Sequence, residues 1–182
     1  MKRWMITRGM ALFLAGGVLG VIGCPCLNGA DGGIDRVSCE WMRQMAGTWR
    51  LVSFNIQDAN GQTTYPFGED AQGRLIYEAN GRMAVQLMDP SRPDFVSPDP
   101  IAATEAEMRA AFDGYTAYYG TYSVDPEAKT IVHHVETSLI PNWVGTDQQR
   151  EFEYDGKLLT LKGSLLLGGV QGTVRLVWER LP

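Results

Sequence analysis

Apolar and polar side chains alternate with a period of two along most of the chain from Gly47 onward. In the first such stretch, Trp49 and Leu51 alternate with Arg50 and Val52. Because successive side chains of a strand point to opposite faces, this period predicts half-buried β-strands. The strands are predicted at residues 47–54, 73–78, 83–88, 115–124, 131–139, 148–154, 158–162 and 173–181. The pattern therefore predicts an all-β domain.

Tight turns separate these segments. Asn60-Gly61 and Asn80-Gly81 each supply the positive φ values that a short hairpin turn needs. Hairpin-linked strands pair antiparallel and close most readily as an up-and-down barrel, because closure removes the exposed edges. We expect such a barrel, with about eight to ten strands. A two-sheet β-sandwich is the alternative architecture.

A short helical insertion interrupts the strands. Residues 89–100 contain four prolines and are predicted to form a loop. Thr104 and Glu107 then have the spacing of a capping box, in which each side chain bonds the backbone N–H of the other residue. The pattern predicts a helix that opens after Thr104 and ends near Phe112.

A second short helix is predicted before the first strand, over residues 38–45 with Ser38 as its N-cap. The apolar side chains of Trp41, Met42 and Met45 share one face of this helix. A helix with one apolar face at this position is suited to plug one end of the barrel.

The N-terminal 23 residues have the composition of an export signal. Lys2, Arg3 and Arg8 form a basic start, and residues 10–23 are apolar and rich in glycine. This apolar run has the length of a signal-peptide core and is short for a membrane span.

Val21-Ile22-Gly23-Cys24 resembles the bacterial lipobox. The resemblance implies that Cys24 receives diacylglycerol and begins the mature chain, and that Pro25 permits sorting to the outer membrane, facing the periplasm. An ordinary signal cleaved elsewhere and a retained anchor are the alternatives. The expected organisation is a signal peptide over residues 1–23, a tether over 24–40 and a barrel domain over 41–182.

Charge and motifs exclude several classes of function. The full chain has a net charge of −5, and beyond residue 23 it holds 13 basic and 21 acidic residues, a net charge of −8. An acidic domain repels a phosphate backbone, so nucleic acid is not an expected partner. The sequence lacks the Gly-x-Ser-x-Gly, Gly-Lys-Ser/Thr and His-Glu-x-x-His motifs that support hydrolase, kinase and metalloprotease assignments.

The three cysteines, Cys24, Cys26 and Cys39, precede the predicted barrel. With Cys24 lipidated, Cys26 and Cys39 remain in an oxidising compartment, where a disulfide can persist. Two thiols without a neighbouring histidine fall short of the usual four-ligand zinc site. We expect no metal and no cofactor.

Several motifs carry a family resemblance. Gly47-Thr48-Trp49 resembles the Gly-x-Trp signature of lipocalins, which implies that Trp49 closes one barrel end and that Arg175 or Arg180 packs across it. Residues 44–181 as a whole resemble the bacterial and fungal lipocalin-like domain family. The resemblance implies a lipocalin-type barrel and little about chemistry. Its other motifs lie at residues 65–68 (YPFG), 73–77 (GRLIY), 112–115 (FDGY), 133–136 (HHVE) and 141–145 (PNWVG).

The two histidines, His133 and His134, are adjacent on a predicted strand and therefore point to opposite faces. The face that holds His133 is the more apolar one, which favours it for the core. Ligand cavities nevertheless carry a few polar groups, and we expect His134 and Glu136 to line the cavity. Such a pair has the chemistry for general acid–base work. The alternatives are a surface pair and a single histidine satisfied inside the barrel.

Aromatic and polar residues supply the other candidates for ligand contacts. Trp143 follows Pro141-Asn142 and is expected at the barrel mouth as a lid or wall. Arg150 is expected to bind an anionic head group or to pair with Glu136. The alternative is that the aromatic residues serve packing alone. The ligand-binding candidates are Gln86, Tyr118, Tyr122, His134, Glu136, Asn142, Trp143 and Arg150.

These features predict a binding protein for a small hydrophobic or amphipathic molecule, attached to the cell envelope by its lipid. An isomerase or cyclase that uses His134 and Glu136 is one alternative. A structural protein that docks through the leucines of residues 162–172 is another, although Leu165–Leu167 also fit a short buried strand.

Overall fold

The structure is a computed structural model that describes residues 36–167 and 170–182. The predicted export signal, the lipidation of Cys24 and most of the tether lie outside the described residues. Within the described part, no helix is long and apolar enough to cross a membrane.

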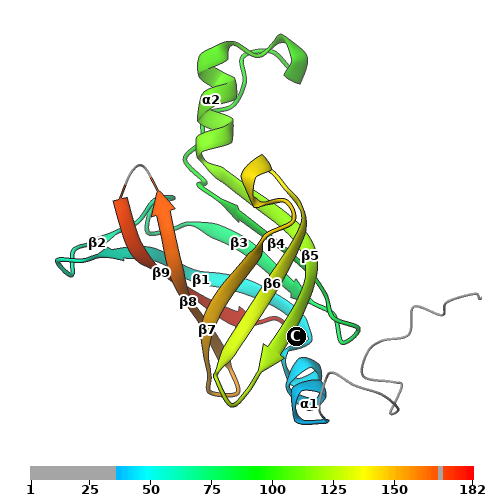
Figure 1. The fold of residues 1–182 in the computed structure, drawn as a ribbon. Coiled ribbons are helices and arrows are strands. Elements are labelled where there is room, and N and C mark those ends of the chain that lie inside the picture. Colours follow the sequence, from blue (N-terminus) through cyan, green and yellow to red (C-terminus); the bar gives the residue numbers. More distant parts are fainter. Residues whose placement is uncertain (1–35, 168–169) are drawn as a thin grey trace, which may run out of the picture.

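The strands form one sheet that closes on itself (Figure 1). β1 and β3 to β9 follow one another around the sheet, each antiparallel to the next, and β9 pairs back with β1. The short β2 extends the sheet beside β1. This closed ring of eight strands confirms the predicted up-and-down barrel and excludes the β-sandwich. The strands are β1 (Gly47–Asp58), β2 (Thr63–Thr64), β3 (Gln72–Tyr77), β4 (Arg82–Met88), β5 (Tyr115–Asp125), β6 (Thr130–Ser138), β7 (Asp147–Tyr154), β8 (Leu158–Leu167) and β9 (Val170–Arg180).

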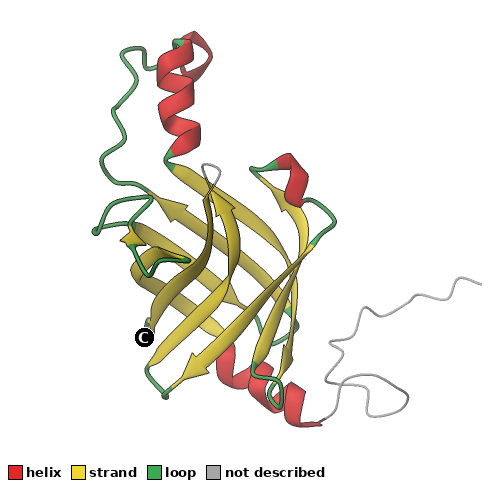
Figure 2. Cartoon of the chain, turned by 60° about the vertical axis from the view of Figure 1, so that its left-hand side comes forward, coloured by secondary structure: helices red, strands yellow, loops and turns green. Residues whose placement is uncertain are grey.

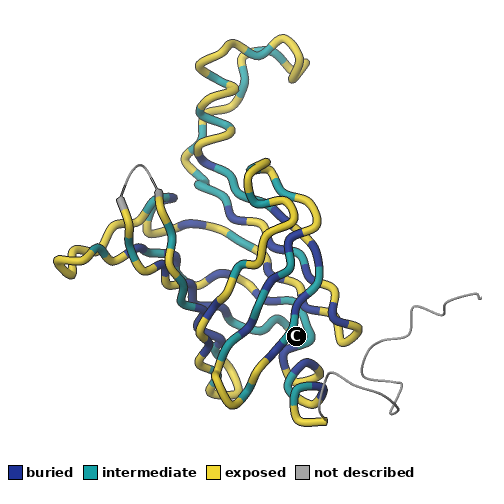
Figure 3. Tube along the Cα trace, viewed as in Figure 1, coloured by how far each residue is buried: buried dark blue, intermediate teal, exposed yellow. Residues whose placement is uncertain are grey.

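The hairpins form where the sequence predicts them. Gly61 and Gly81 have φ values of 83° and 88°, which glycine adopts without steric cost. Along the strands, buried and exposed residues alternate (Figure 3), because one face of each strand points into the barrel. Leu165–Leu167 belong to β8, which pairs with β9, so the leucines proposed for docking lie on a strand.

A helix covers one end of the barrel, which we call the closed end (Figures 1 and 2). This helix, α1 (Arg36–Met45), buries Cys39, Met42 and Met45 and confirms the predicted plug. The prediction of Ser38 as N-cap is wrong, because Ser38 lies within the helix. Cys39 is disulfide-bonded, and its predicted partner Cys26 lies outside the described residues.

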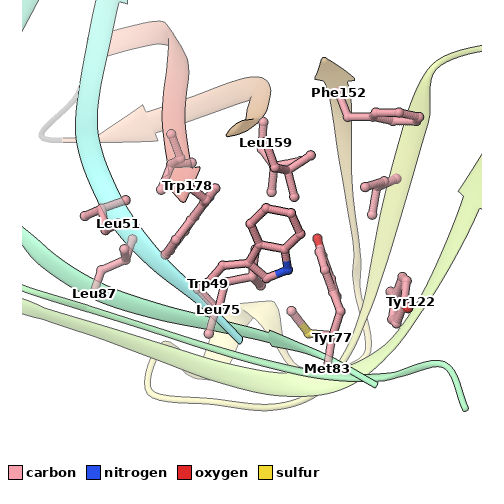
Figure 4. Packing of buried hydrophobic residues seen from close by; sticks show 14 of the residues in the cluster. Trp49, Leu51, Leu75, Tyr77, Met83, Leu87, Tyr122, Phe152, Leu159 and Trp178 are labelled. Carbon is pink, nitrogen blue, oxygen red and sulfur yellow. The ribbon is translucent and has the colours of Figure 1, made fainter. Parts of the chain in front are cut away.

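The closed end is held by side-chain hydrogen bonds to the last carbonyls of α1, of which that of Met42 also accepts from the N–H of Ala46. The Trp49 indole Nε1 donates to the carbonyl of Met45 at 3.0 Å, and the Tyr122 hydroxyl donates to that of Met42 at 3.1 Å. Arg180 donates to the carbonyl of Ala46, and its guanidinium carbon lies 4.3 Å from the centre of the Trp49 ring. Of the two arginines predicted to cover Trp49, Arg180 is therefore the one that does so. Trp49 is fully buried, and Figure 4 shows its ring among Leu75, Tyr77, Leu159 and Trp178.

An arm projects from the opposite end of the barrel (Figure 2). It holds the 3-10 turn η1 (Pro100–Ala102) and the helix α2 (Glu105–Asp113). Both hydrogen bonds of the predicted Thr104–Glu107 capping box are present. Apolar side chains on this arm, including Val96 and Ile101, are exposed to solvent.

Candidate ligand-binding site

A cavity of about 210 Å³ lies inside the barrel at the end away from α1, which we call the open end. At its mouth lie Ile140, which precedes the 3-10 turn η2 (Pro141–Trp143), and Trp143, which ends it. Leu165 and Leu166 of β8 lie there too. The wall is largely apolar, and its polar lining comes from Thr116, Tyr118, His133 and Arg150. Small-molecule sites have this composition, with few polar groups on an apolar wall. Aromatic rings in the wall come from Phe54, Phe67, Tyr118, Trp143 and Trp178.

A polar cluster lies in the barrel between the cavity and the closed end, formed by Tyr77, Tyr118, His133 and Arg150. The Tyr77 hydroxyl lies 2.6 Å from His133 Nε2, and the Tyr118 hydroxyl lies 2.8 Å from His133 Nδ1. A neutral imidazole has one donor and one acceptor nitrogen, so one hydroxyl donates to the ring and the other accepts from it. His133 is only 2% exposed, and these two bonds satisfy it.

Arg150 reaches this cluster from β7. Along that strand the inward residues from the open end are Gln148, Arg150 and Phe152, and Phe152 packs on Trp41 of α1. Arg150 Nη1 donates to the carbonyl of Gln149 at 3.1 Å, and Nη2 donates to Gln148 Oε1 at 3.3 Å. The guanidinium is therefore held at mid-height in the barrel by neutral acceptors.

Burial sets the charge of the cluster. It lowers the pKa of His133 to about 3, helped by the positive charge of Arg150. Burial also raises the pKa of Tyr77 and of Tyr118, with the charge of Arg150 opposing the rise. At neutral pH, His133 and both tyrosines are uncharged, so Arg150 carries the charge of the cluster.

The expected orientation of the two histidines is wrong. His133 faces the interior, whereas His134 lies on the outer face, where its Nδ1 is 2.7 Å from Asp147 Oδ1. Glu136 is exposed at the β-bulge that shifts the β5–β6 register between Tyr119 and Gly120. The apolar alternation of β6 predicts His133 inside, and the structure follows it. His133 can lie there because the hydroxyls of Tyr77 and Tyr118 bond its ring nitrogens. Without inward His134 and Glu136, the acid–base hypothesis loses its residues.

The outer face brings Ser123, His134 and Asp147 together. Ser123 Oγ lies 3.1 Å from His134 Nε2, so the contacts follow the order of a Ser-His-Asp triad. These residues lie on β5, β6 and β7, whose backbone amides are engaged in the sheet ladders. Amides bonded in this way are not free to form an oxyanion hole. We therefore interpret the three residues as cross-strand polar pairs.

The structure brings Tyr118, Trp143 and Arg150 together at the cavity, with the Tyr118 and Trp143 rings 5.8 Å apart. It does not bring the other candidates there. Tyr122 packs at the closed end, and Asn142 is exposed in η2.

Gln86 lies on the outside of the barrel, in an open groove of about 610 Å³. This groove has a larger volume than the cavity, but charged and polar side chains form much of its wall, so it offers a poor site for an apolar ligand.

Sequence reasoning missed Tyr77 and His133 as interior residues of the polar cluster, of which His133 also lines the cavity. Tyr77 is the last inward residue of β3, in phase with buried Leu75. His133 is in phase with Ile131 and Val135 on β6. The period-two pattern would have placed both inside if it had been followed strictly.

Comparison with known proteins gives matches of very different strength. A curated relative, the 4'-hydroxy-3'-methoxypropiophenone carrier protein of Aspergillus oryzae (strain ATCC 42149 / RIB 40), is 32% identical over 108 residues, covering 55% of this chain and 97% of that protein. A solved structure of the siderocalin Ex-FABP is 11% identical, with coverage of 76% of this chain and 71% of that one, and its TM-score of 0.28 is too low to support an argument. The family profile of the lipocalin-like domain matches residues 46–181, and the chain therefore belongs to the lipocalin-like domain family.

Proposed function

We propose that this protein binds and carries a small, largely apolar molecule in the cavity at the open end of the barrel. The observation that carries the proposal is the cavity itself, with its apolar wall and a few polar groups deep inside. Burial of apolar ligand surface supplies about 25 cal/mol per Å² before the costs of association are subtracted. The polar cluster then orients the ligand.

The size of the cavity supports a small aromatic ligand. An apolar cavity of about 150 Å³ accepts benzene, and this one measures about 210 Å³, with Trp143 and Leu166 in its lining at the open end. The relative from Aspergillus oryzae is named as a carrier of a propiophenone, a compound with a single aromatic ring. Its name and the dimensions of this cavity favour the same class of ligand.

Ligand extraction and a cavity-filling variant test the proposal. We expect native mass spectrometry of the full chain, purified from its own host, to show a bound small molecule that organic solvent releases. Val174 lines the cavity and Val52 lies on the outer face, so Val174→Phe should abolish binding of N-phenyl-1-naphthylamine while Val52→Phe leaves it unchanged. Circular dichroism would establish that both variants fold. Equal dye binding by the two variants would contradict the proposed site.

We also propose that the protein acts in the cell envelope as a lipoprotein anchored through Cys24. The proposal rests on the sequence pattern Val21-Ile22-Gly23-Cys24. The described chain begins in α1 at the closed end, so an anchor upstream would leave the cavity mouth at the far end. Metabolic labelling with palmitate should mark the wild-type chain and not Cys24→Ala. Equal labelling of both would refute lipidation at this residue.

A further inference from the structure

We propose that the cavity selects small aromatic molecules that carry a carboxylate, and that Arg150 pairs with this carboxylate. The inference rests on the proposed function, since it names the class of ligand for the same cavity. Three features carry it: a buried cation without an anionic partner, a guanidinium fixed at the cavity wall, and walls rich in aromatic rings.

Arg150 is buried and has no acidic partner among the residues that the structure describes. Its exposed fraction is 7%, and within residues 36–167 and 170–182 no carboxylate oxygen lies within 4.0 Å of its guanidinium nitrogens. Glu136, the expected partner, is on the outside. A charge removed from water is costly unless an opposite charge compensates it. A carboxylate in the adjoining cavity would provide that compensation.

The barrel makes room for this guanidinium and fixes it. Gly163 of β8 lies beside the Arg150 side chain, and a Cβ there would lie 2.7 Å from Arg150 Nη1. The Gln149 carbonyl and the Gln148 side chain each accept one of its hydrogen bonds. These acceptors hold the fork of the guanidinium without neutralising its charge. A preorganised fork can bind a carboxylate with two parallel hydrogen bonds.

At pH 7, Arg150 is the one charged group in the described lining of the cavity. Arg150 and His133 are its titratable groups other than Tyr118, and His133 is neutral at pH 7 because burial holds its pKa at about 3. His133 bonds the hydroxyls of Tyr77 and Tyr118, which leaves the positive charge of Arg150 as the electrostatic feature that a ligand meets.

The walls favour a flat ring next to this charge. Phe54, Phe67, Trp143 and Trp178 line the cavity together with Tyr118. Aromatic side chains bind a ligand ring through offset and edge-to-face contacts. A volume of about 210 Å³ leaves room for a ring system with one short acidic substituent.

The first experiment compares two probes that differ in charge and little else, 2-naphthoate and 2-naphthamide. Displacement of N-phenyl-1-naphthylamine from the full wild-type chain at pH 7 gives both dissociation constants. We expect the carboxylate to bind about tenfold or more tightly than the amide, as a charge-assisted hydrogen bond implies. Equal binding, or tighter binding of the amide, would overturn the selection for acids.

Substitutions then assign the effect to Arg150. Arg150→Met should lower the affinity for 2-naphthoate to that for 2-naphthamide, with the amide changed by less than about threefold. Arg150→Lys should retain part of the preference, because it keeps the charge and loses the fork. The matched control is Arg175→Met on the exposed side of β9, which should keep the full preference. Circular dichroism checks folding. If Arg150→Met fails to fold, the preference of Arg150→Lys for 2-naphthoate is compared with that of the wild type instead.

The outcomes separate this inference from the proposed function. If the neutral dye binds and 2-naphthoate does not displace it better than the amide, the cavity is a binding site without selection for acids. If Arg150→Met retains the full preference, a group other than Arg150 binds the carboxylate. If no probe binds, including the neutral dye, the proposed function falls together with the inference.

Discussion

The closed end and the open end of the barrel use the same kinds of side chain in opposite ways. At the closed end, Trp49, Tyr122 and Arg180 donate hydrogen bonds to the final carbonyls of α1 or to the carbonyl of Ala46 just beyond it. At the open end, Trp143 stands at a mouth and Arg150 faces a cavity with only neutral acceptors around it.

The two arginines show what this difference means. Arg180 lies against the negative end of the α1 dipole and over the face of Trp49, so the fold itself compensates its charge. Arg150 has neither a helix end nor a carboxylate within the described residues. The closed end is complete without a ligand, whereas the open end gains compensation from one. Substitutions should therefore reduce stability at one end and affinity at the other.

The largest effect is expected at the closed end, from Trp49→Ala. Trp49 is fully buried, packs edge-on against Tyr154 and bonds the end of α1. Truncating such a residue removes about 3–5 kcal/mol from the free energy of unfolding. Urea unfolding followed by circular dichroism would measure the loss. A melting temperature equal to that of the wild type would show that the closed end does not hold the barrel.

The polar cluster gives a pH-dependent effect. The pKa of His133 is about 3 in the folded protein, below the ordinary value of about 6.5. Below pH 6.5, His133 is protonated in the unfolded chain but stays neutral in the folded chain. Its contribution to stability is therefore fully present above this pH and is lost as the pH falls. Between pH 7 and pH 5 the free energy of unfolding should fall by about 2 kcal/mol.

The neighbouring histidine provides the control for this pH dependence. His133→Gln places a neutral amide inside the barrel and should abolish the decline in stability, while His134→Ala should retain it. Urea unfolding at pH 7, 6 and 5 compares the three proteins. A decline that persists in His133→Gln would assign it to other groups.

Local patterns were sufficient to predict most of the fold. The Asn-Gly turns, the Thr104 capping box and the period-two segments each concern residues a few positions apart. The lipocalin resemblance predicted that an arginine packs on Trp49. The prediction holds because β1 and β9 pair when the barrel closes. The choice of Arg180 over Arg175 required the register of the two strands.

The interior of the site was harder to predict because its polar residues depend on partners from other strands. His133 is acceptable inside only because Tyr77, from β3, and Tyr118, from β5, bond its two nitrogens. The bulge at Glu136 also breaks strict alternation, and it depends on Gly120, where a Cβ would lie 2.0 Å from the carbonyl oxygen of His134. Neither contact has a signature within its own strand.

At the open end, Trp143→Ala should reduce affinity far more than stability. Trp143 is half-buried at the mouth, and losing about 50 Å² of apolar contact with a ligand corresponds to roughly tenfold in Kd. Dye titration and thermal unfolding measure the two effects. Val144→Ala, one residue further along and exposed, is the matched control and should change neither. A large fall in melting temperature for Trp143→Ala would instead make Trp143 part of the structural core.

The smallest effect is expected outside both ends, from His134→Ala. His134 pairs with Asp147 on the solvent-facing side of the sheet, and exposed pairs of this kind contribute less than about 1 kcal/mol. Because its side chain points away from the cavity, the dissociation constant for N-phenyl-1-naphthylamine should equal that of the wild type, whereas His133→Gln, on the adjacent residue, alters the cavity wall. Titrations of the two variants side by side therefore test the inward and outward faces of β6 directly. A loss of affinity in His134→Ala alone would mean that the ligand binds the outer face, and that the cavity is not the functional site.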